Sequence, residues 1–170
     1  WDESWEMSKV EKAAAAFKAT LEKLSSQRSV VTAAVRSDAK KASSAASPSS
    51  NTVKKVKIGI IGCGQMGQWH LDAYRKMESV ELLAFADTDI IKANNFTKKL
   101  NANAYSSYQE MFQKEKLDGV SVCTVPSTHR EIVLAALDAG VNVLCEKPMA
   151  VSAAQAREMS EKARAKNKIL

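Results

Sequence analysis

The sequence has 170 residues, which is enough for one domain with a hydrophobic core and too few for two full-sized domains. It holds 25 Lys and Arg residues against 19 Asp and Glu; residues 1–55 carry 10 basic and 6 acidic residues, which leaves 15 and 13 for residues 56–170. Because the longer part is nearly neutral and its densest basic run (Lys54, Lys55 and Lys57) is short, nucleic-acid binding is not expected.

The three cysteines, Cys63, Cys123 and Cys145, form no CxxC pair and no cluster of the kind that binds metal. We interpret them as small buried hydrophobic residues in a reducing compartment. No apolar run approaches the roughly 18 residues that cross a membrane, and no signal-peptide core is present. The sequence therefore predicts a cytoplasmic protein with neither a membrane span nor a metal site.

Residues 1–24 are expected to form an amphipathic helical extension, with the helix over Ser8–Leu24. Ser8 and Glu11 have the spacing of a capping box. Apolar residues follow in steps of three and four at Met7, Val10, Ala14, Phe17, Leu21 and Leu24. A lone helix of this length is marginal in water, so it needs a surface, either another protein or the domain itself. The alternative is a partly disordered tail with a nascent helix.

Residues 25–52 are rich in Ser and Ala, carry four basic residues against one acid, and have no sustained period. This composition predicts a linker or a disordered segment. It also resembles an organellar transit peptide, so import into a stroma or matrix remains an alternative location. The sequence begins at Trp1 rather than Met and ends where another strand is expected to start, which is consistent with a piece of a longer product.

From residue 53 onward the pattern alternates between strands and helices. Strands are expected at Val56–Ile61, Val80–Ala86, Ala104–Ser106, Asp118–Cys123 and Val141–Cys145, with a further one starting at Lys168–Leu170. Helices are expected over Gln65–Met77, Ile90–Leu100, Ser107–Lys114, Thr128–Ala139 and Ser152–Lys166. Each of the last three begins with its expected N-cap residue, Ser107, Thr128 or Ser152. Gly140 is expected to end the helix over Thr128–Ala139. Short connections of this kind predict an α/β domain with a doubly wound parallel sheet of the Rossmann type over residues 53–170.

Three glycines, Gly62, Gly64 and Gly67, lie between the first expected strand and its helix with the spacing of a dinucleotide fingerprint. In that position they would allow the tight turn, the close approach of a pyrophosphate and the close packing of helix on strand. Asp87 follows the second strand, where a carboxylate accepts hydrogen bonds from the adenosine ribose. Because this carboxylate would repel a 2′-phosphate, NAD is predicted in preference to NADP. Lys92, a nearby basic residue, is the one feature that favours NADP.

Two further segments carry a family resemblance. Pro126-x-x-His129 follows the fourth expected strand, and Glu146-Lys147-Pro148 follows the fifth. Together with the GCGxMGxxH run that ends at His70, this ordered set resembles the glucose–fructose oxidoreductase, inositol dehydrogenase and rhizopine-catabolism (Gfo/Idh/MocA) family over roughly residues 56–170. Taken singly, histidines placed like His70 and His129 are more often packing or capping residues than catalytic ones.

The resemblance implies a role for each matching residue. The cofactor contacts would be Gly62, Gly64, Gln65, Met66 and Gly67 at the pyrophosphate, Asp87 at the ribose, Thr124, Pro126, Ser127 and His129 along the path to the nicotinamide, and Glu146 and Pro148 beside it. Lys147 would be the catalytic residue, because an ammonium near a substrate hydroxyl can place the substrate and aid proton transfer.

The resemblance also implies a two-domain enzyme whose second domain supplies the substrate floor and an Asp/His pair, neither of which is recognisable in residues 1–170. We therefore expect the nucleotide-binding half of an NAD(P)-dependent sugar or polyol oxidoreductase, inactive by itself. The alternative is a non-enzymatic Rossmann-like subunit that docks into a larger assembly through the Met7–Leu24 helix.

Overall fold

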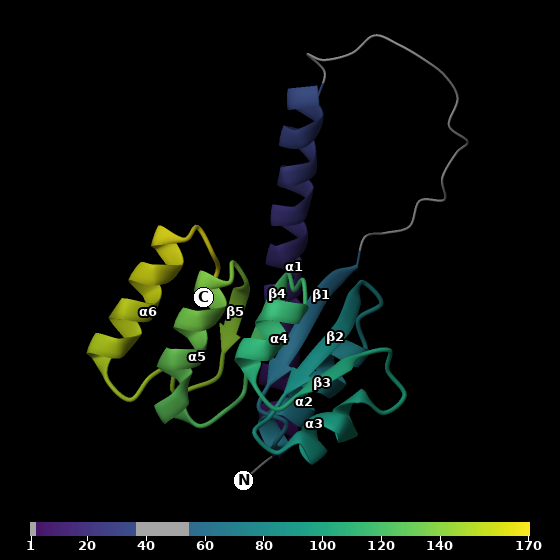
Figure 1. Cartoon of the computed structure of the whole chain (residues 1–170), viewed down its shortest axis with the longest axis vertical. Helices are drawn as coiled ribbons and strands as arrows, with labels where there is room; N and C mark the ends of the chain where they lie inside the picture. The colour runs from purple at the N-terminus through teal and green to yellow at the C-terminus, as the bar shows by residue number, and fades with distance from the viewer. Residues whose placement is uncertain (1–2, 37–54) are drawn as a thin grey trace.

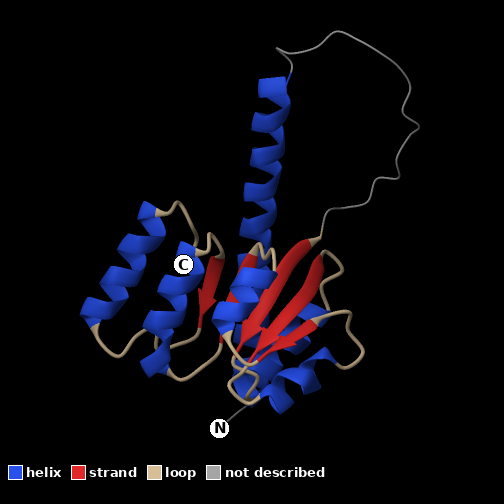
Figure 2. Cartoon of the chain, viewed as in Figure 1, coloured by secondary structure: helices blue, strands red, loops and turns tan. Residues whose placement is uncertain are grey.

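The computed structural model describes residues 3–36 and 55–170, and Figures 1 and 2 show a parallel sheet with helices on both of its faces. The strands are β1 (Val56–Ile61), β2 (Val80–Ala86), β3 (Asn103–Tyr105), β4 (Gly119–Val122) and β5 (Asn142–Cys145). They are all parallel and are ordered β3-β2-β1-β4-β5. The predicted doubly wound α/β fold is therefore confirmed, and the order of strands reverses direction between β1 and β4, where such sheets bind ligands.

The helices form one layer on each face. They are α1 (Glu3–Arg36), α2 (Gln65–Arg75), α3 (Ile90–Thr97), α4 (Tyr108–Lys114), α5 (Pro126–Asp138) and α6 (Ala153–Ala165). One buried cluster joins α1, α2 and α3 to the sheet, and a second joins α4, α5 and α6 to the opposite face. In Figure 1, α4, α5 and α6 lie in front of the sheet, and α1 and α2 lie behind it.

The alternation of side chains along β4 explains how both layers fit. Val120 and Val122 point into the cluster under α5, whereas Gly119 and Ser121 face α1 and α2. A Cβ atom on Gly119 would lie 2.8 Å from side-chain carbons of both Phe17 and Leu21. The absent side chain at this position therefore gives α1 room to pack directly on the sheet.

The N-terminal helix is longer than its sequence pattern predicts, because it runs over Glu3–Arg36 rather than Ser8–Leu24. Four residues of the apolar stripe, Val10, Ala14, Phe17 and Leu21, are buried; Met7 packs partly buried against them, and Leu24 is 37% exposed. Of the two surfaces proposed for the stripe, the structure shows the domain itself.

The assignment of residues 25–36 to an irregular linker is wrong, since they continue α1. Once a helix is nucleated each further residue adds a hydrogen bond, and no Gly or Pro occurs before Pro48 to stop it. In Figure 1 this end of α1 extends past the edge of the sheet. The remainder of the proposed linker, residues 37–52, lies outside the described residues.

The capping box predicted at Ser8 and Glu11 is wrong, because α1 starts at Glu3 and Ser8 lies inside the helix. Of the three caps predicted within residues 53–170, two are confirmed. Ser107 Oγ accepts from Glu110 N at 3.4 Å, and Ser152 Oγ accepts from Gln155 N at 3.3 Å. The cap at Thr128 is wrong, because α5 starts at Pro126, a residue that suits the first helical position, and Thr128 lies inside the first turn. Gly140 follows the end of α5 with a φ of 76°, as expected for a glycine after a helix.

The bounds of β1 and β2 are those predicted, and the other element boundaries within residues 56–170 differ by at most a few residues. The strand expected at Lys168–Leu170 does not form. Val143 N donates to Ile169 O at 3.0 Å, but Ile169 N donates to the side-chain Oδ1 of Asn142 at 3.1 Å. A side-chain amide thus replaces the second ladder bond. Within residues 3–36 and 55–170, no helix is both long and apolar enough to cross a membrane.

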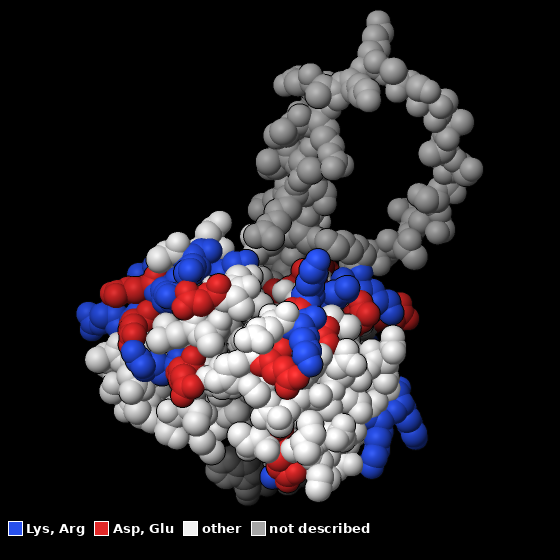
Figure 3. All heavy atoms as spheres, viewed as in Figure 1, with Lys and Arg blue, Asp and Glu red and all other residues white. Residues whose placement is uncertain are grey.

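Charged side chains of both signs are interspersed on the face drawn in Figure 3. Several form ion pairs between neighbouring helices; Arg130 of α5 binds Glu158 of α6 through two hydrogen bonds of 2.6 Å, and Asp138 lies 2.8 Å from Lys162. These contacts lower the pKa values of the Asp138 and Glu158 carboxyls through hydrogen bonds from their basic partners. This mixed pattern is typical of a solvated helix surface.

Candidate functional site

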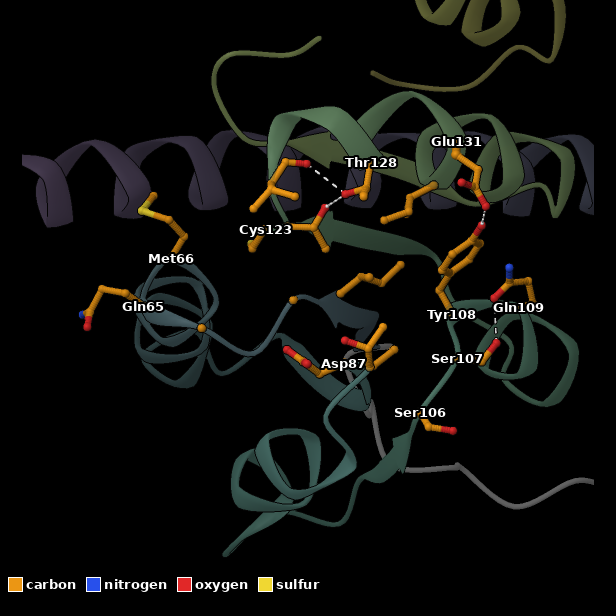
Figure 4. Close-up of a pocket in the computed structure, with 18 residues that line it drawn as sticks. Gln65, Met66, Asp87, Ser106, Ser107, Tyr108, Gln109, Cys123, Thr128 and Glu131 are labelled. Carbon is orange, nitrogen blue, oxygen red and sulfur yellow. Dashed lines mark hydrogen bonds between the residues drawn. The ribbon is translucent and has the colours of Figure 1, made fainter. Parts of the chain in front are cut away.

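A cavity of about 710 Å³ opens at the carboxyl ends of the strands (Figure 4). Its walls are the loop between β1 and α2, the end of β2, the turn between β3 and α4, and the start of α5. Six of the residues predicted for cofactor binding line it: Gly62, Gly64, Gln65, Met66, Asp87 and Thr124. This volume is typical of pockets that hold small molecules and cofactors.

The three glycines of the loop have different surroundings. Gly62 has a φ of +92°, and a Cβ atom there would lie 2.7 Å from the carbonyl carbon of Cys123. A Cβ atom on Gly67 would lie 2.0 Å from Gly62 O, so α2 approaches the loop more closely than any other residue type permits. At Gly64 a Cβ atom would meet nothing within 4 Å. Gly62 and Gly67 therefore allow the backbone packing, and Gly64 leaves the cavity open.

The N-terminus of α2 faces this open space. Gly64 is its N-cap and makes no side-chain capping bond, and the first turn carries no acidic residue. The unpaired backbone N–H groups and the positive end of the helix dipole together favour an anion such as a phosphate.

Asp87 is held rigidly at the end of β2. Its Oδ2 accepts from Cys63 N at 2.8 Å, and its Oδ1 accepts from Asp89 N at 2.9 Å. The carboxylate is half-buried and lines the cavity, so it joins the glycine loop to the end of the second strand. Lys92, the contrary feature for the choice of cofactor, is not a lining residue; its Nζ lies 4.0 Å from Asp89 Oδ2.

One wall of the cavity was missed by the sequence reasoning. It consists of Ser106, Ser107, Tyr108 and Gln109 after β3, with Thr128, Glu131 and Ile132 on α5. The hydroxyl of Tyr108 donates a hydrogen bond to Glu131 across the mouth (Figure 4), and burial together with this bond raises the pKa of Tyr108 to about 12. The pairing of β3 with β2 places this wall beside Asp87, and no local sequence motif marks it.

The other predicted residues, among them Pro126 and Ser127, lie outside the cavity walls. His129 is fully buried, with Nδ1 3.1 Å from Pro148 O and Nε2 3.0 Å from Thr124 O. It therefore ties the segment after β5 to the segment after β4. The Lys147–Pro148 peptide bond is cis, and the side chain of Lys147 is 65% exposed.

A buried chain of hydrogen bonds runs from α2 to Glu146. Tyr74 OH lies 2.8 Å from Ser121 Oγ, which lies 3.1 Å from His70 Nδ1, and His70 Nε2 lies 2.8 Å from Glu146 Oε1. Burial raises the pKa of Tyr74, so its phenol remains a donor. With the His70 proton on Nε2, each group in the chain donates to the next and all are satisfied.

Glu146 ends this chain and also binds the next residue, since Lys147 N donates to Glu146 Oε2 at 3.0 Å. Burial opposes the negative charge of Glu146, but the hydrogen bonds from His70 and from the backbone N–H of Lys147, together with the charge of the Lys147 side chain, outweigh it and lower the pKa of Glu146 below its ordinary 4.5. The glutamate and histidine of the two sequence motifs thus act together to hold the backbone of Lys147.

We expect this lowered pKa to contribute to stability above pH 4.5 and to lose that contribution as the pH falls through the folded-state value. The free energy of unfolding of Glu146→Gln should therefore lie below that of the unsubstituted protein at pH 7, and the difference should shrink at pH values below 4.5. Urea denaturation at several pH values measures it, with exposed Glu78→Gln as the control for removing one charge. A pH-independent difference for Glu146→Gln would contradict the pairing.

The three cysteines are free, and none is poised as a nucleophile. Burial, and in second place the charge of Asp87, raises the pKa of Cys63 to about 12. Burial likewise raises the pKa values of Cys123 and Cys145. Since the thiolate is the reactive form, these side chains serve as packing residues around the loop.

The sheet order, the open glycine loop and the carboxylate at the end of β2 define a dinucleotide-binding domain of the Rossmann class. Residues 56–170 match the sequence profile of the oxidoreductase family with an NAD-binding Rossmann fold, Gfo/Idh/MocA. The chain belongs to the Gfo/Idh/MocA family, as its motifs predict.

Similar proteins include dehydrogenases and reductases that act on different substrates. D-glucoside 3-dehydrogenase of Escherichia coli is 38% identical over 124 residues, which are 72% of this chain and 35% of the relative. Among solved structures, GenD2 from gentamicin A biosynthesis with NAD has a TM-score of 0.67 at 25% identity, covering 75% of this chain and 36% of its own. A 3-ketoreductase of Actinomadura kijaniata with NADP has a TM-score of 0.64 at 28% identity, covering 68% and 36%. The chain thus spans about a third of the length of these relatives.

Proposed function

We propose that this chain is the dinucleotide-binding half of an NAD(P)-dependent oxidoreductase that acts on a sugar or polyol. The observation that carries the proposal is the open surface at Gly64, beneath the cavity and at the uncapped N-terminus of α2. Anion-binding backbone without a Cβ atom in the way is what a pyrophosphate needs. The substrate class rests on the names of relatives such as D-glucoside 3-dehydrogenase and myo-inositol 2-dehydrogenase.

Different segments of the chain are proposed to bind different parts of the dinucleotide. The glycine loop with Gln65 and Met66 would hold the pyrophosphate, Asp87 the adenosine ribose, and the segments around Thr124 and Glu146 the path to the nicotinamide. When bound, a nicotinamide dinucleotide supplies hydride transfer to or from a substrate carbon. Lys147, as the proposed catalytic residue, would place the substrate hydroxyl and hold or accept its proton.

We further propose that NAD is preferred to NADP. The fixed carboxylate of Asp87 lines the cavity and would repel a 2′-phosphate, whereas Lys92 lies beside Asp89 and not at the cavity wall. Relatives of known structure are found with either cofactor, so this preference rests on the residues of this chain.

Titration with NADH and NADPH, followed by fluorescence, tests both proposals. We expect the chain to bind NADH more tightly, and Asp87→Asn to weaken NADH binding by roughly tenfold to a hundredfold, because a hydrogen bond to a charged group contributes about 1.5–3 kcal/mol. The same substitution should reduce the ratio of NADH affinity to NADPH affinity. Asp89→Asn, which removes a neighbouring carboxylate outside the cavity wall, is the matched control. Absence of NADH binding would overturn the proposed function, and tenfold tighter binding of NADPH would overturn the preference.

Residues 1–170 by themselves are expected to bind the dinucleotide without measurable turnover, because the relatives are about three times longer than the matched segment. Robust oxidation of a polyol by this polypeptide would refute that expectation. The alternative, a non-enzymatic subunit docked through its N-terminal helix, is favoured less, because the apolar stripe of α1 is already buried against its own domain.

A further inference from the structure

The ammonium group of Lys147 faces the N-terminal helix. Its Nζ lies 3.6 Å from Oε2 of Glu6, on the second turn of α1. The two side chains differ in exposure: Glu6 is 11% exposed, and Lys147 is 65% exposed. A largely buried carboxylate is costly unless a cation or hydrogen-bond donor compensates it, and Lys147 supplies that cation.

The position of Glu6 is set by the packing of α1 rather than by its own side chain. One turn further on, Val10 is buried against the domain, and Phe17 packs over Gly119 at the amino end of β4. A second ion pair joins Glu11 of α1 to Lys76 at the end of α2. The carboxylate of Glu6 is therefore placed at the carboxyl end of the sheet by a helix that packs on the domain from Val10 to Leu21.

Lys147 is consequently held at both of its ends. Its backbone N–H is bound by Glu146, which His70 orients from inside the domain, and its ammonium group is held by Glu6 from α1. Both contacts act on the second residue after β5, beside Pro148, which His129 ties to the end of β4. The backbone contact uses the family's own motifs, whereas Glu6 precedes the family match, which begins at residue 56.

We propose that Glu6 is a positioning residue for Lys147, so that α1 is a working part of the cofactor domain and not an appendage to it. The carboxylate limits where the ammonium group can go and keeps it at the end of β5. The importance of this for a reaction rests on the role proposed above for Lys147. The pairing itself is independent of any cofactor.

Site-resolved acylation of lysines, read by peptide mass spectrometry, tests the pairing in the full chain. Glu6→Gln keeps the shape of the side chain and removes its charge. We expect it to raise the acylation rate of Lys147 by about 1.5-fold to fivefold, the range that an exposed ion pair can supply. Glu11→Gln is the matched control on the same helix: it should raise the rate at Lys76 and leave Lys147 unchanged. Equal effects of both variants on Lys147 would show that docking of α1 matters rather than the Glu6 carboxylate, and would overturn the proposal.

A salt titration of the unsubstituted protein provides a test that needs no variant. Because the partners are partly exposed, added salt should screen their attraction and raise the acylation rate of Lys147 toward that of Glu6→Gln, whose own rate should stay constant. A merely structural role of Glu6 would not produce this salt dependence, so a flat response in the unsubstituted protein overturns the proposal.

Saturating NADH separates this inference from the proposed function. We expect NADH to protect Lys147 from acylation in the unsubstituted protein and to protect it less in Glu6→Gln; equal protection in both would overturn the positioning role. If NADH binds neither protein, the proposed function fails, while the acylation and salt results still decide whether Glu6 and Lys147 are paired.

Discussion

Gly67→Ala is expected to destabilise the domain by more than about 3 kcal/mol, whereas Gly64→Ala, three residues away, is expected to cost about 1 kcal/mol or less. The Cβ atom of an alanine at 67 would lie 2.0 Å from Gly62 O and 3.1 Å from Gly62 C. Both are backbone atoms of a loop that is itself packed on Cys123, so relief requires α2 to move away from the sheet. Since a domain has only about 5–15 kcal/mol of stability, this variant should be largely unfolded or strongly destabilised.

Gly64→Ala should have the opposite profile, with a retained fold and weakened binding. Its Cβ atom meets nothing within 4 Å, and φ and ψ of −89° and −160° suit alanine, so the main stability cost is the poorer N-cap. The methyl group would, however, stand on the cavity floor where the pyrophosphate is proposed to lie. We expect NADH affinity to fall by about tenfold or more, equivalent to about 1.4 kcal/mol.

Urea denaturation followed by circular dichroism, together with NADH titration, distinguishes the two variants. Equal stabilities for Gly64→Ala and Gly67→Ala would contradict the close approach of α2 to the loop. Unchanged NADH affinity in a folded Gly64→Ala protein would show that the dinucleotide does not cross this glycine.

Phe17→Ala should lower the free energy of unfolding by about 3–5 kcal/mol, the cost of removing a buried aromatic ring and leaving a cavity. Phe17 is 5% exposed and packs over Gly119, a position that has no side chain with which to fill the space. The variant should also make the Glu6–Lys147 contact less persistent, because that contact depends on the packing of α1 against the sheet.

Lys12→Ala is the matched control, since Lys12 is exposed on the same helix and alanine is a good helix former. We expect its free energy of unfolding to stay within about 0.5 kcal/mol of the unsubstituted protein. If Phe17→Ala were equally mild, α1 would not be part of the core, and its apolar stripe would again be available to another protein.

The parallel sheet and the glycine loop were predictable because each depends on local patterns. The strand Val80–Ala86 is apolar at every position except Glu81, and its bounds are confirmed residue for residue. The cap at Ser107 is confirmed for the same reason, since its partner lies three residues away. The predicted cap at Thr128 is wrong because residues inside a helix share its spacing to Glu131. Pro126, two residues earlier, is the stronger signal for the start of the helix.

The extent of α1 and the second wall of the cavity were less predictable. Periodicity marks only the part of a helix that is buried, so it ended at Leu24 while the backbone continues to Arg36. Tyr108 and Glu131 meet across 23 residues of sequence, and nothing local to either indicates the other.

The sequence by itself determined the fold class and the family, because these depend on short ordered motifs and on periodicity along single elements. Only the tertiary structure decided that α1 packs on its own domain, that His70 orients Glu146, and that Glu6 reaches Lys147. These contacts join residues 76 and 141 positions apart, and such separations are set by how the layers pack on the sheet. No spacing along the chain encodes them.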